Sequence, residues 1–283
     1  MNAIQPAPDM AAAVSPELRE KLDALDLWGN VRELTDNGYT VIQDPAAHAL
    51  TGRVREAILR LAGESEGRNA GRRAGLLLGR DPVFPQAVVV PRLLALVEFL
   101  LGRGALLSQL IGTVRREDAT GLALHADNSW FPAPFPQWEI MCTACWVTDE
   151  FTLDNGATLV IPGTHKHKSH PPRDIRRSLA GAIPIEAPAG SIALWDGSVW
   201  HGSYPRRNPG ERVVMHMTYT RIGMQPIDDY GHLDDAWLAD KDPQLRNLLG
   251  RDLFFHSTTE KNGSTDADLL ANTYRLVHGP DGY

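Results

Sequence analysis

The feature that most constrains the fold of this 283-residue chain is a series of short β-strand patterns in its second half. Between residues 105 and 222, runs of apolar and β-branched residues alternate with tight-turn pairs such as Asn-Gly, Asp-Gly and Pro-Gly. The predicted strands cover residues 105–114, 122–126, 139–148, 158–161, 183–187, 191–195 and 213–221. Many short strands with regular turns are typical of a β-sandwich or barrel. The chain is therefore predicted to be mainly β.

Helical patterns flank this region. Ser15 followed by Pro16 predicts the start of the first helix, because serine caps helix N-termini and proline fits the first turn. Further helices are predicted over residues 31–36, 45–61, 91–101 and 234–249, and one more strand over residues 39–42. Helices thus dominate the first hundred residues and are expected to support the β-rich part.

No linker rich in Pro, Ser or Gly divides the chain, so we expect one domain over residues 1–283. Residues 1–15 are predicted to be a loose tail and residues 16–104 mostly helical support. Residues 105–222 form the predicted β core, and residues 223–283 a C-terminal cover.

Charge and hydropathy exclude some classes of partner. The formal net charge is -7 and the basic residues are evenly scattered, which argues against nucleic acid as the main partner. The most apolar stretch, residues 93–101, is short and is interrupted by Glu98, and no leader pattern begins the chain. We therefore expect a cytoplasmic protein without a membrane partner. The sequence does not predict the oligomeric state.

His125, Asp127 and His201 are the candidate metal ligands. On a strand, residues two apart share a face, so His125 and Asp127 would lie side by side. Two neutral imidazoles and one carboxylate on one face of a metal are typical of non-haem Fe(II) oxygenases. A His-x-Asp tripeptide is a weak signal by itself, since such a pair can simply be hydrogen-bonded. The polar and aromatic loop that follows it, residues 128–131, is typical of a strand end where ligands bind.

Three features together resemble the phytanoyl-CoA dioxygenase family of Fe(II)- and 2-oxoglutarate-dependent oxygenases. The first is His125-x-Asp127 with the distal His201, and the second is the block Asn-Gly-Ala-Thr-Leu-Val-Ile-Pro-Gly-Thr-His-Lys over residues 155–166. The third is His-Gly-Ser from His201, followed by Arg212. The resemblance spans roughly residues 105 to 222, and the sequence before it, including residues 36–42, also fits the family's opening.

The resemblance implies a double-stranded β-helix core, which is a jelly roll of the cupin type, and a role for each of several residues. His125, Asp127 and His201 would bind Fe(II). Arg212 would bind the far carboxylate of 2-oxoglutarate, for which a planar guanidinium is well suited. Three further residues are implied as co-substrate contacts: a hydroxyl that shares this carboxylate, a tryptophan that lines the pocket and, by a looser alignment, a polar side chain, namely Ser203, Trp146 and Gln109.

The activity implied by the family is oxidation of an unactivated carbon of a small molecule, with O2 and 2-oxoglutarate converted to product, succinate and carbon dioxide. Related halogenases replace the metal-binding carboxylate with a small residue, whereas Asp127 is present here, so hydroxylation or another oxidation is expected. Two alternatives stay open. One is a cupin-like Fe oxygenase that needs no 2-oxoglutarate, and the other is a non-catalytic ligand-binding homologue. The substrate is not predicted.

Other residues have less specific patterns. Cys142 and Cys145 lie three apart on a predicted strand, so they would face opposite sides as buried, inert thiols. Residues 63–80 are predicted to be a mobile loop with four arginines that are either solvated or meet an acidic substrate. The histidines of residues 165–170 form either a second metal cluster or an exposed basic loop, and His216 is expected to be a hydrogen-bonded core residue.

The aromatic residues of the loop at residues 130–138 either wall a substrate pocket or pack rigidly on the sheet.

Overall fold

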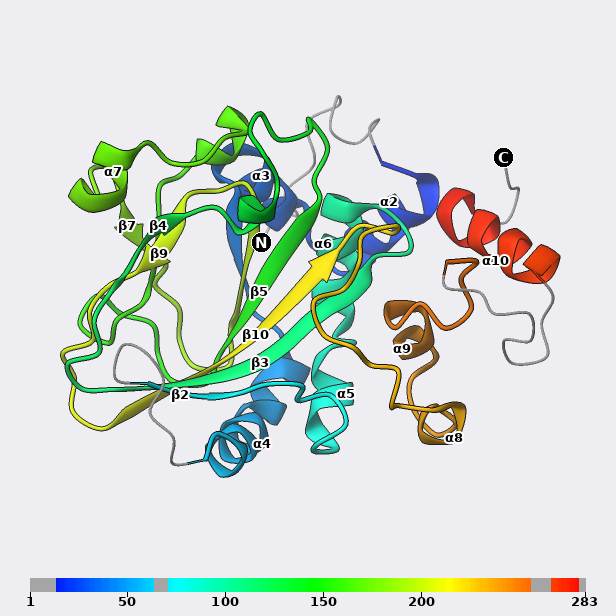
Figure 1. The fold of residues 1–283 in the computed structure, drawn as a ribbon, viewed down its shortest axis with the longest axis horizontal. Coiled ribbons are helices and arrows are strands. Elements are labelled where there is room, and N and C mark those ends of the chain that lie inside the picture. The colour runs from blue at the N-terminus through cyan, green and yellow to red at the C-terminus, as the bar shows by residue number, and fades with distance from the viewer. Residues whose placement is uncertain (1–13, 64–70, 256–265, 280–283) are drawn as a thin grey trace.

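In a computed structural model of the protein, residues 14–63, 71–255 and 266–279 are described. Most of the predicted N-terminal tail and Arg68 therefore lie outside the described residues. The described part contains two antiparallel sheets with helices around them, as Figure 1 shows.

The larger sheet has six strands in the order β1-β8-β5-β10-β3-β2. Their bounds are β1 (Tyr39–Ile42), β8 (Ile192–Asp196), β5 (Met141–Val147), β10 (Glu211–Thr220), β3 (Leu106–Arg116) and β2 (Gly71–Ala74). The smaller sheet has the order β4-β9-β6-β7, with β4 (Leu122–His125), β9 (His201–Ser203), β6 (Thr158–Val160) and β7 (Ile183–Pro184). Two such sheets with flanking helices confirm the predicted class, a mainly β jelly roll.

The alternation of side chains along the strands of the larger sheet separates a helix-covered face from an inner face. In β5, Cys142, Ala144 and Trp146 belong to the core shared with the helices, whereas Cys145 and Val147 belong to the core between the sheets. The two cysteines are thus buried on opposite faces, as predicted, and both are free thiols. Burial raises the pKa of the Cys145 thiol to about 12.

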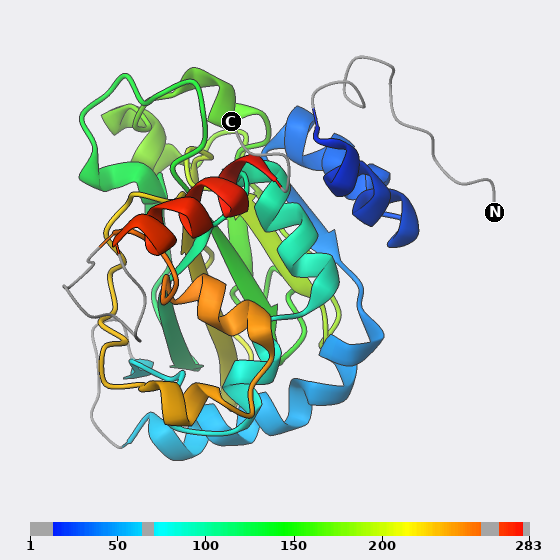
Figure 2. The same ribbon diagram turned by 90° about the vertical axis from the view of Figure 1, so that its right-hand side faces the viewer.

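Within the described residues, five helices precede the β core, and Figure 2 shows several of them from the side. They are α2 (Pro16–Ala24), α3 (Trp28–Asn37), α4 (Pro45–Leu61), α5 (Val83–Ala87) and α6 (Pro91–Leu101). The predicted cap is present, because the Ser15 hydroxyl accepts a hydrogen bond from the Leu18 N–H at 3.2 Å. None of the helices in the described ranges is long and apolar enough to cross a membrane.

Several local predictions are corrected. Residues 71–74, predicted to belong to a mobile loop, form β2, which pairs with β3 at the edge of the larger sheet. The predicted helix over residues 234–249 is two short helices, α8 (Asp235–Leu238) and α9 (Pro243–Leu248). Asp242 caps α9 and Pro243 occupies its first turn, so the chain starts a new helix there.

Helices also occur where none was predicted. They are α5, α7 (Arg173–Ser178) and, in the predicted C-terminal cover, α10 (Asp266–His278). Figures 1 and 2 place α8, α9 and α10 at the end of the molecule away from β4 and β9. The division into tail, support, core and cover within one domain stays a prediction.

Gly202 allows β4 and β9 to approach each other closely. A Cβ added at this position would overlap the backbone oxygen of Leu122 and lie 3.2 Å from the Ala123 carbonyl atoms. Because these are backbone atoms, the two strands would have to separate.

We expect Gly202→Ala to lower the free energy of unfolding by about 1–3 kcal/mol, as overpacked sites do. Gly52→Ala is the matched control, since Gly52 lies on the exposed side of α4 with open space around it. That change should raise the free energy of unfolding by about 0.5–1 kcal/mol. Urea unfolding of both variants measures the difference, and equal midpoints would contradict the close approach.

Candidate metal centre

Pairing of β4 with β9 brings two of the predicted ligands together. His125 and His201 are direct partners across these antiparallel strands. Their ring centroids lie 4.3 Å apart with the ring planes inclined by 50°. Two residues that are 76 positions apart in the sequence therefore meet because β4 pairs with β9. The register of these two short strands fixes the position of one imidazole relative to the other.

Asp127 joins the two histidines from just beyond the strand. β4 ends at His125, and Asp127 is the first residue of a 3-10 turn, η1 (Asp127–Trp130). The prediction of one strand through both residues is therefore corrected. Ala126 is still extended, with φ -111° and ψ 142°, so the side chains on either side of it point the same way.

The three side chains form a compact group of ligand atoms. Asp127 Oδ1 lies 3.7 Å from His125 Nε2 and 3.4 Å from His201 Nε2. One ligand atom from each residue lies within 4.8 Å of the other two, and this is the sole such group of His, Cys, Asp or Glu in the part of the chain that the structure describes. The three predicted metal ligands are thus adjacent.

Backbone carbonyls orient both imidazoles. His125 Nδ1 lies 3.1 Å from the Ala123 oxygen, and His201 Nδ1 lies 3.0 Å from the Val199 oxygen. A carbonyl can only accept, so each Nδ1 carries the proton and each Nε2 keeps its lone pair. Both lone pairs lie on the Asp127 side, which is the arrangement that a metal ligand needs.

The second oxygen of Asp127 is held by two donors from the larger sheet. Asp127 Oδ2 accepts from Thr143 Oγ1 at 2.8 Å and from Trp195 Nε1 at 3.0 Å. These bonds leave Oδ1 directed at the histidines. Thr143 and Trp195 were not predicted from the sequence, because their roles depend on strand registers and on no local motif. Their positions on the inner face of predicted strands were the one available signal.

The charges of the three groups depend on one another. Burial raises the pKa of Asp127, but the two imidazoles and Thr143 outweigh burial and lower it below its usual value. Burial opposes protonation of His201, yet contact with the Asp127 carboxylate raises its pKa, while burial and His201 lower the pKa of His125. When His201 takes up a proton at Nε2, this proton pairs with Asp127, and metal binding must displace it to free the lone pair.

These residues fit a divalent iron ion. Two neutral imidazoles and one carboxylate, each fixed by a hydrogen bond on its far side, are the donor set typical of non-haem Fe(II). All three come from one rim of the jelly roll. The donors thus occupy one side of the site and leave the other side for further ligands.

Arg212 lies on the inner face of the larger sheet and is almost wholly buried, with 4% of its surface exposed. Its Nη1 donates to the Asn155 oxygen at 3.3 Å and to the Gly156 oxygen, and its guanidinium carbon lies 5.0 Å from the centroid of the Phe151 ring. Its Nε is buried without a partner among the described residues. Burial lowers its pKa to about 10, because a cation in a buried position is unfavourable without an anionic partner.

Ser203 faces the same interior, two residues beyond His201 on β9. Its hydroxyl oxygen accepts from Arg115 Nη1 at 2.7 Å and from the Leu122 N–H at 3.1 Å. The interior thus has a metal-ligand group on one side and a cationic group around Arg212 and Ser203 on the other. A buried Arg with an unpartnered donor fits the far carboxylate of 2-oxoglutarate.

The structure does not bring Trp146 to this interior. Its side chain lies on the helix-covered face, where Nε1 donates to Thr51 Oγ1 of α4 at 3.1 Å. The expectation that Trp146 lines the co-substrate pocket is corrected for this reason: β5 turns alternate residues to opposite faces, and Thr143 and Cys145 take the inner one.

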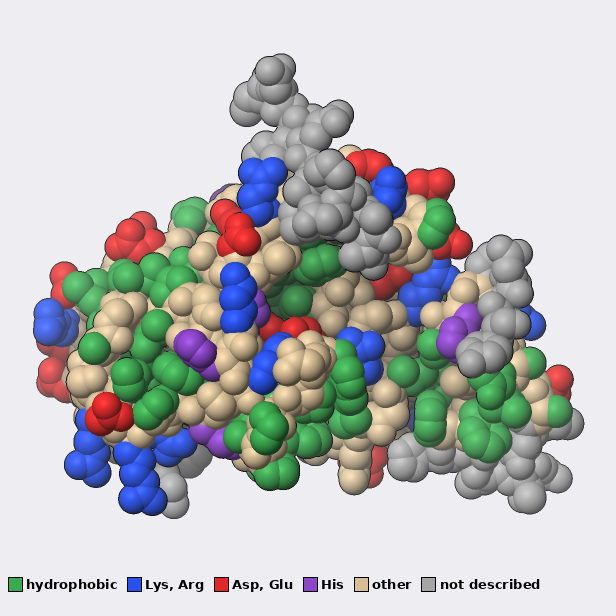
Figure 3. All heavy atoms as spheres, turned by 90° about the horizontal axis from the view of Figure 1, so that it is seen from above, with side chains coloured by type: hydrophobic (Ala, Val, Ile, Leu, Met, Phe, Trp, Pro, Cys, Tyr) green, Lys and Arg blue, Asp and Glu red, His purple; other side chains and the backbone are tan. Residues whose placement is uncertain are grey.

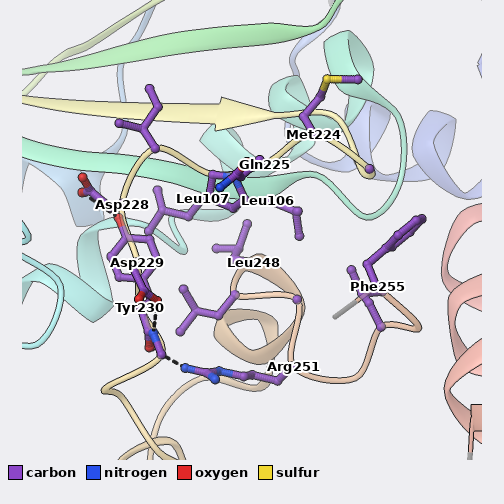
Figure 4. A pocket seen from close by; sticks show the side chains of 17 residues that line it. Leu106, Leu107, Met224, Gln225, Asp228, Asp229, Tyr230, Leu248, Arg251 and Phe255 are labelled. Atoms are coloured by element: carbon purple, nitrogen blue, oxygen red, sulfur yellow. Dashed lines mark hydrogen bonds between the residues drawn. The ribbon is translucent and has the colours of Figure 1, made fainter. Parts of the chain in front are cut away.

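Gln109 lies near the other end of the larger sheet, opposite Thr218 on β10. Its Nε2 donates to Asp228 Oδ1 at 3.3 Å, and Asp228 also lines a cavity of 680 Å³. Figure 4 shows this cavity, with Leu106, Leu107 and Leu248 along it and Arg251 hydrogen-bonded to the Tyr230 backbone. The metal-ligand group and Arg212 are not part of its lining, so this cavity does not mark the site.

The histidines of residues 165–170 do not form a second metal cluster in the structure described. His165 is buried and bonded through Nε2 to the Thr35 oxygen, and His170 lies 3.1 Å from the Phe131 oxygen. His167 stacks on Trp200 with the ring centroids 5.1 Å apart. The alternative of a fully exposed basic loop is also corrected by the burial of His165.

His216 is bonded as expected of a core histidine, since its Nε2 lies 3.4 Å from Thr113 Oγ1. Burial and the charge of Arg212 lower its pKa to about 4, so the imidazole is neutral at pH 7.

The loop after η1 divides between rim and core. Trp130 has 72% of its surface exposed and Trp138 has 49%, whereas Phe135 is buried with 2% exposed. The burial of Phe135 fits the alternative of a packed loop, whereas a pocket wall formed by Trp130 and Trp138 stays a prediction. Figure 3 views this upper face and shows Lys, Arg and His side chains gathered near its middle.

Comparisons with known proteins agree with this geometry. The sequence profile of the family described as phytanoyl-CoA dioxygenase matches residues 34–214. An uncharacterised protein of Mycobacterium tuberculosis is 29% identical over 230 residues, which are 75% of this chain and 82% of that protein. Dioxygenase af480 of Aspergillus fumigatus is 32% identical over 174 residues, which are 60% of this chain and 55% of that protein.

Solved structures share the fold. HygX from Streptomyces hygroscopicus with nickel, 2-oxoglutarate and hygromycin B bound has a TM-score of 0.61 at 18% identity, covering 70% of this chain and 88% of that chain. HygX with nickel and 2-oxoglutarate has a TM-score of 0.58 at 18% identity, covering 76% of this chain and 90% of that one.

The donor geometry predicts which histidines matter for metal binding. We expect His201→Ala to abolish stoichiometric Fe(II) binding under anaerobic conditions, because two ligands remain. His167→Ala is the control from the loop at residues 165–170, and it should bind Fe(II) as the unaltered protein does. Equilibrium dialysis with metal analysis measures both. Loss of binding in His167→Ala alone would contradict the assignment.

The contact between Thr143 and Asp127 predicts a smaller effect. Thr143→Val removes one of the two bonds to Asp127 Oδ2 and should weaken Fe(II) binding by roughly 10- to 100-fold, as loss of such supporting bonds does elsewhere. Thr220→Val is the matched control, since Thr220 is also a buried sheet threonine and its hydroxyl has no partner among the residues described. Equal affinities in the two variants would contradict the role of Thr143.

Proposed function

Since the chain belongs to the phytanoyl-CoA dioxygenase family, we propose that its interior site oxidises a small molecule with Fe(II), 2-oxoglutarate and O2. The single observation that carries the proposal for the site is the meeting of His125, Asp127 and His201, with ligand atoms within 4.8 Å of one another. The same interior contains the buried Arg212 with an unpartnered Nε.

Family membership confirms the predicted class of activity, an Fe(II)- and 2-oxoglutarate-dependent dioxygenase. The alternative of a non-catalytic homologue has no support in the site, where each ligand is held by a second contact. A cupin-like oxygenase without 2-oxoglutarate would have no use for a buried arginine that lacks an anionic partner.

The proposed roles follow from the contacts. Bound iron would activate O2, which is the oxidant: two of the electrons that reduce it come from 2-oxoglutarate as this becomes succinate and carbon dioxide, and two come from the oxidised substrate. His125 and His201 keep their Nε2 lone pairs for the metal, because their Nδ1 protons are donated to the oxygens of Ala123 and Val199, respectively. Asp127 adds one negative charge and is kept in place by Thr143 and Trp195.

Arg212 and Ser203 are proposed to bind the carboxylate of 2-oxoglutarate far from the metal. The paired N–H groups of a guanidinium match a carboxylate in geometry, and a buried charge-assisted contact is stronger than an exposed one. Arg212 lies between the two sheets, next to Phe151, so water has little access to its guanidinium.

The substrate is proposed to be a small molecule that enters beside Trp130, whose side chain is exposed at the end of the turn that begins with Asp127. HygX, which shares the fold, has been crystallised with hygromycin B, and this supports a small-molecule substrate without naming one. Because Asp127 occupies the position that related halogenases leave open, the proposed reaction is hydroxylation or another oxidation. The cytoplasmic location and the absence of a nucleic-acid partner stay predictions, and the oligomeric state stays open.

Co-substrate turnover tests the proposed function. We expect the protein with Fe(II), 2-oxoglutarate and O2 to release succinate above the metal-free control, and His201→Ala to release none. Arg212→Ala should raise the KM for 2-oxoglutarate by at least roughly tenfold, because a buried charge-assisted pair is lost. Succinate is measured by chromatography with a panel of small-molecule substrates. Unchanged turnover in Arg212→Ala would favour the cupin-like alternative.

A further inference from the structure

A second arginine lies beside Arg212. Arg115 on β3 is the direct partner of Arg212 on β10, and paired residues of adjacent antiparallel strands point to the same face. The Arg115 side chain reaches from the larger sheet to Ser203 on the smaller one, at 2.7 Å, and also donates to the Thr120 oxygen. Arg212 reaches the smaller-sheet side likewise, at Gly156. Both guanidinium groups thus bridge the sheets at the same end.

Neither arginine has a salt bridge to a carboxylate among the residues that the structure describes, although Arg212 is buried and Arg115 is half-buried. Two neighbouring cations are unfavourable in a region of restricted water access, and Asp149, the carboxylate whose charge acts on Arg212, is bound to Arg55 at 3.0 Å. Burial lowers the pKa of both groups, and the charge of Arg115 lowers that of Arg212 further. The pair is therefore incomplete without an anion.

The hydrogen bonds of Ser203 point to the same anion. Its oxygen already accepts from Arg115 Nη1 and from the Leu122 N–H, which occupies both of its acceptor positions. The hydroxyl proton must then be donated, and no described residue accepts it. Arg115 consequently makes Ser203 a donor that faces the interior.

We infer that Arg115 is a positioning residue for the far carboxylate of 2-oxoglutarate, acting by orienting the Ser203 hydroxyl and by adding a second positive charge beside Arg212. This inference rests on the proposed function. It goes beyond the family pattern, which accounts for Arg212 and Ser203 alone. It also predicts that the site selects a keto acid with two carboxylates over one with a single carboxylate.

Binding measured without turnover tests the inference. Protein loaded with Ni(II) is titrated by calorimetry with 2-oxoglutarate and, separately, with pyruvate, which lacks the far carboxylate. Arg115→Gln should weaken 2-oxoglutarate binding by roughly 10- to 100-fold and leave pyruvate binding unchanged. Arg115→Lys keeps the positive charge and should lose less 2-oxoglutarate affinity than Arg115→Gln. Arg72→Gln is the control, since Arg72 lies on the neighbouring β2 but is paired with Glu211 at 2.6 Å, and it should bind both keto acids normally.

Ser203→Ala and the double variant distinguish positioning from a structural role. If Arg115 acts through Ser203, the fold loss of 2-oxoglutarate affinity in the double variant is smaller than the product of the fold losses in the two single variants. If Arg115 had a merely structural role, Arg115→Gln would weaken the binding of both keto acids equally. That result, or normal 2-oxoglutarate binding by Arg115→Gln, would overturn the inference and leave the proposed function standing. If the unaltered protein bound 2-oxoglutarate no better than pyruvate, the proposed function would fail, and the inference with it.

Discussion

The site depends on the close pairing of two very short strands. β4 has four residues and β9 has three, so few backbone hydrogen bonds join them, and their separation is set by the missing side chain at Gly202. This pairing places His125 opposite His201. Asp127 joins them one extended residue later. The carbonyl that orients His125 is that of Ala123 in β4, and the one that orients His201 is that of Val199 in the turn before β9. Backbone geometry therefore determines both ring orientations.

The alternation of side chains along the larger sheet serves stability and chemistry at once. One face carries the apolar residues that pack with the helices, and the other carries Thr143 near the metal ligands and Arg212 at the far end. A shift of one residue in any central strand would exchange these two sets. Burial of the helix-covered face therefore also fixes which polar residues face the site.

Much of this could be predicted from local patterns. Turn pairs and strand periodicity predicted the two-sheet fold, and the spacing of His125, Asp127, His201 and Arg212 predicted the family, which is confirmed. Predictions failed where a residue's role depends on distant partners. Trp146 was assigned to the co-substrate pocket from the family resemblance, but the alternation of side chains along β5 directs it toward α4. Thr143, Trp195 and Arg115 have no motif, because their contacts arise from strand register. β2 is a polar segment that is ordered by its pairing with β3, whereas α10 has apolar residues at helical spacing that were not recognised as a helix.

The burial of the two cysteines has a consequence for the lifetime of such a protein. Iron that reacts with oxygen next to protein side chains exposes them to oxidants, and cysteine is damaged mainly through its thiolate. Cys145 faces the interior that the site occupies, yet with a pKa of about 12 it is almost entirely a thiol at neutral pH. Cys142 is screened by the sheet itself on the other face. The fold thus keeps both cysteine thiols buried and chemically quiet, although one of them faces the interior that the site occupies.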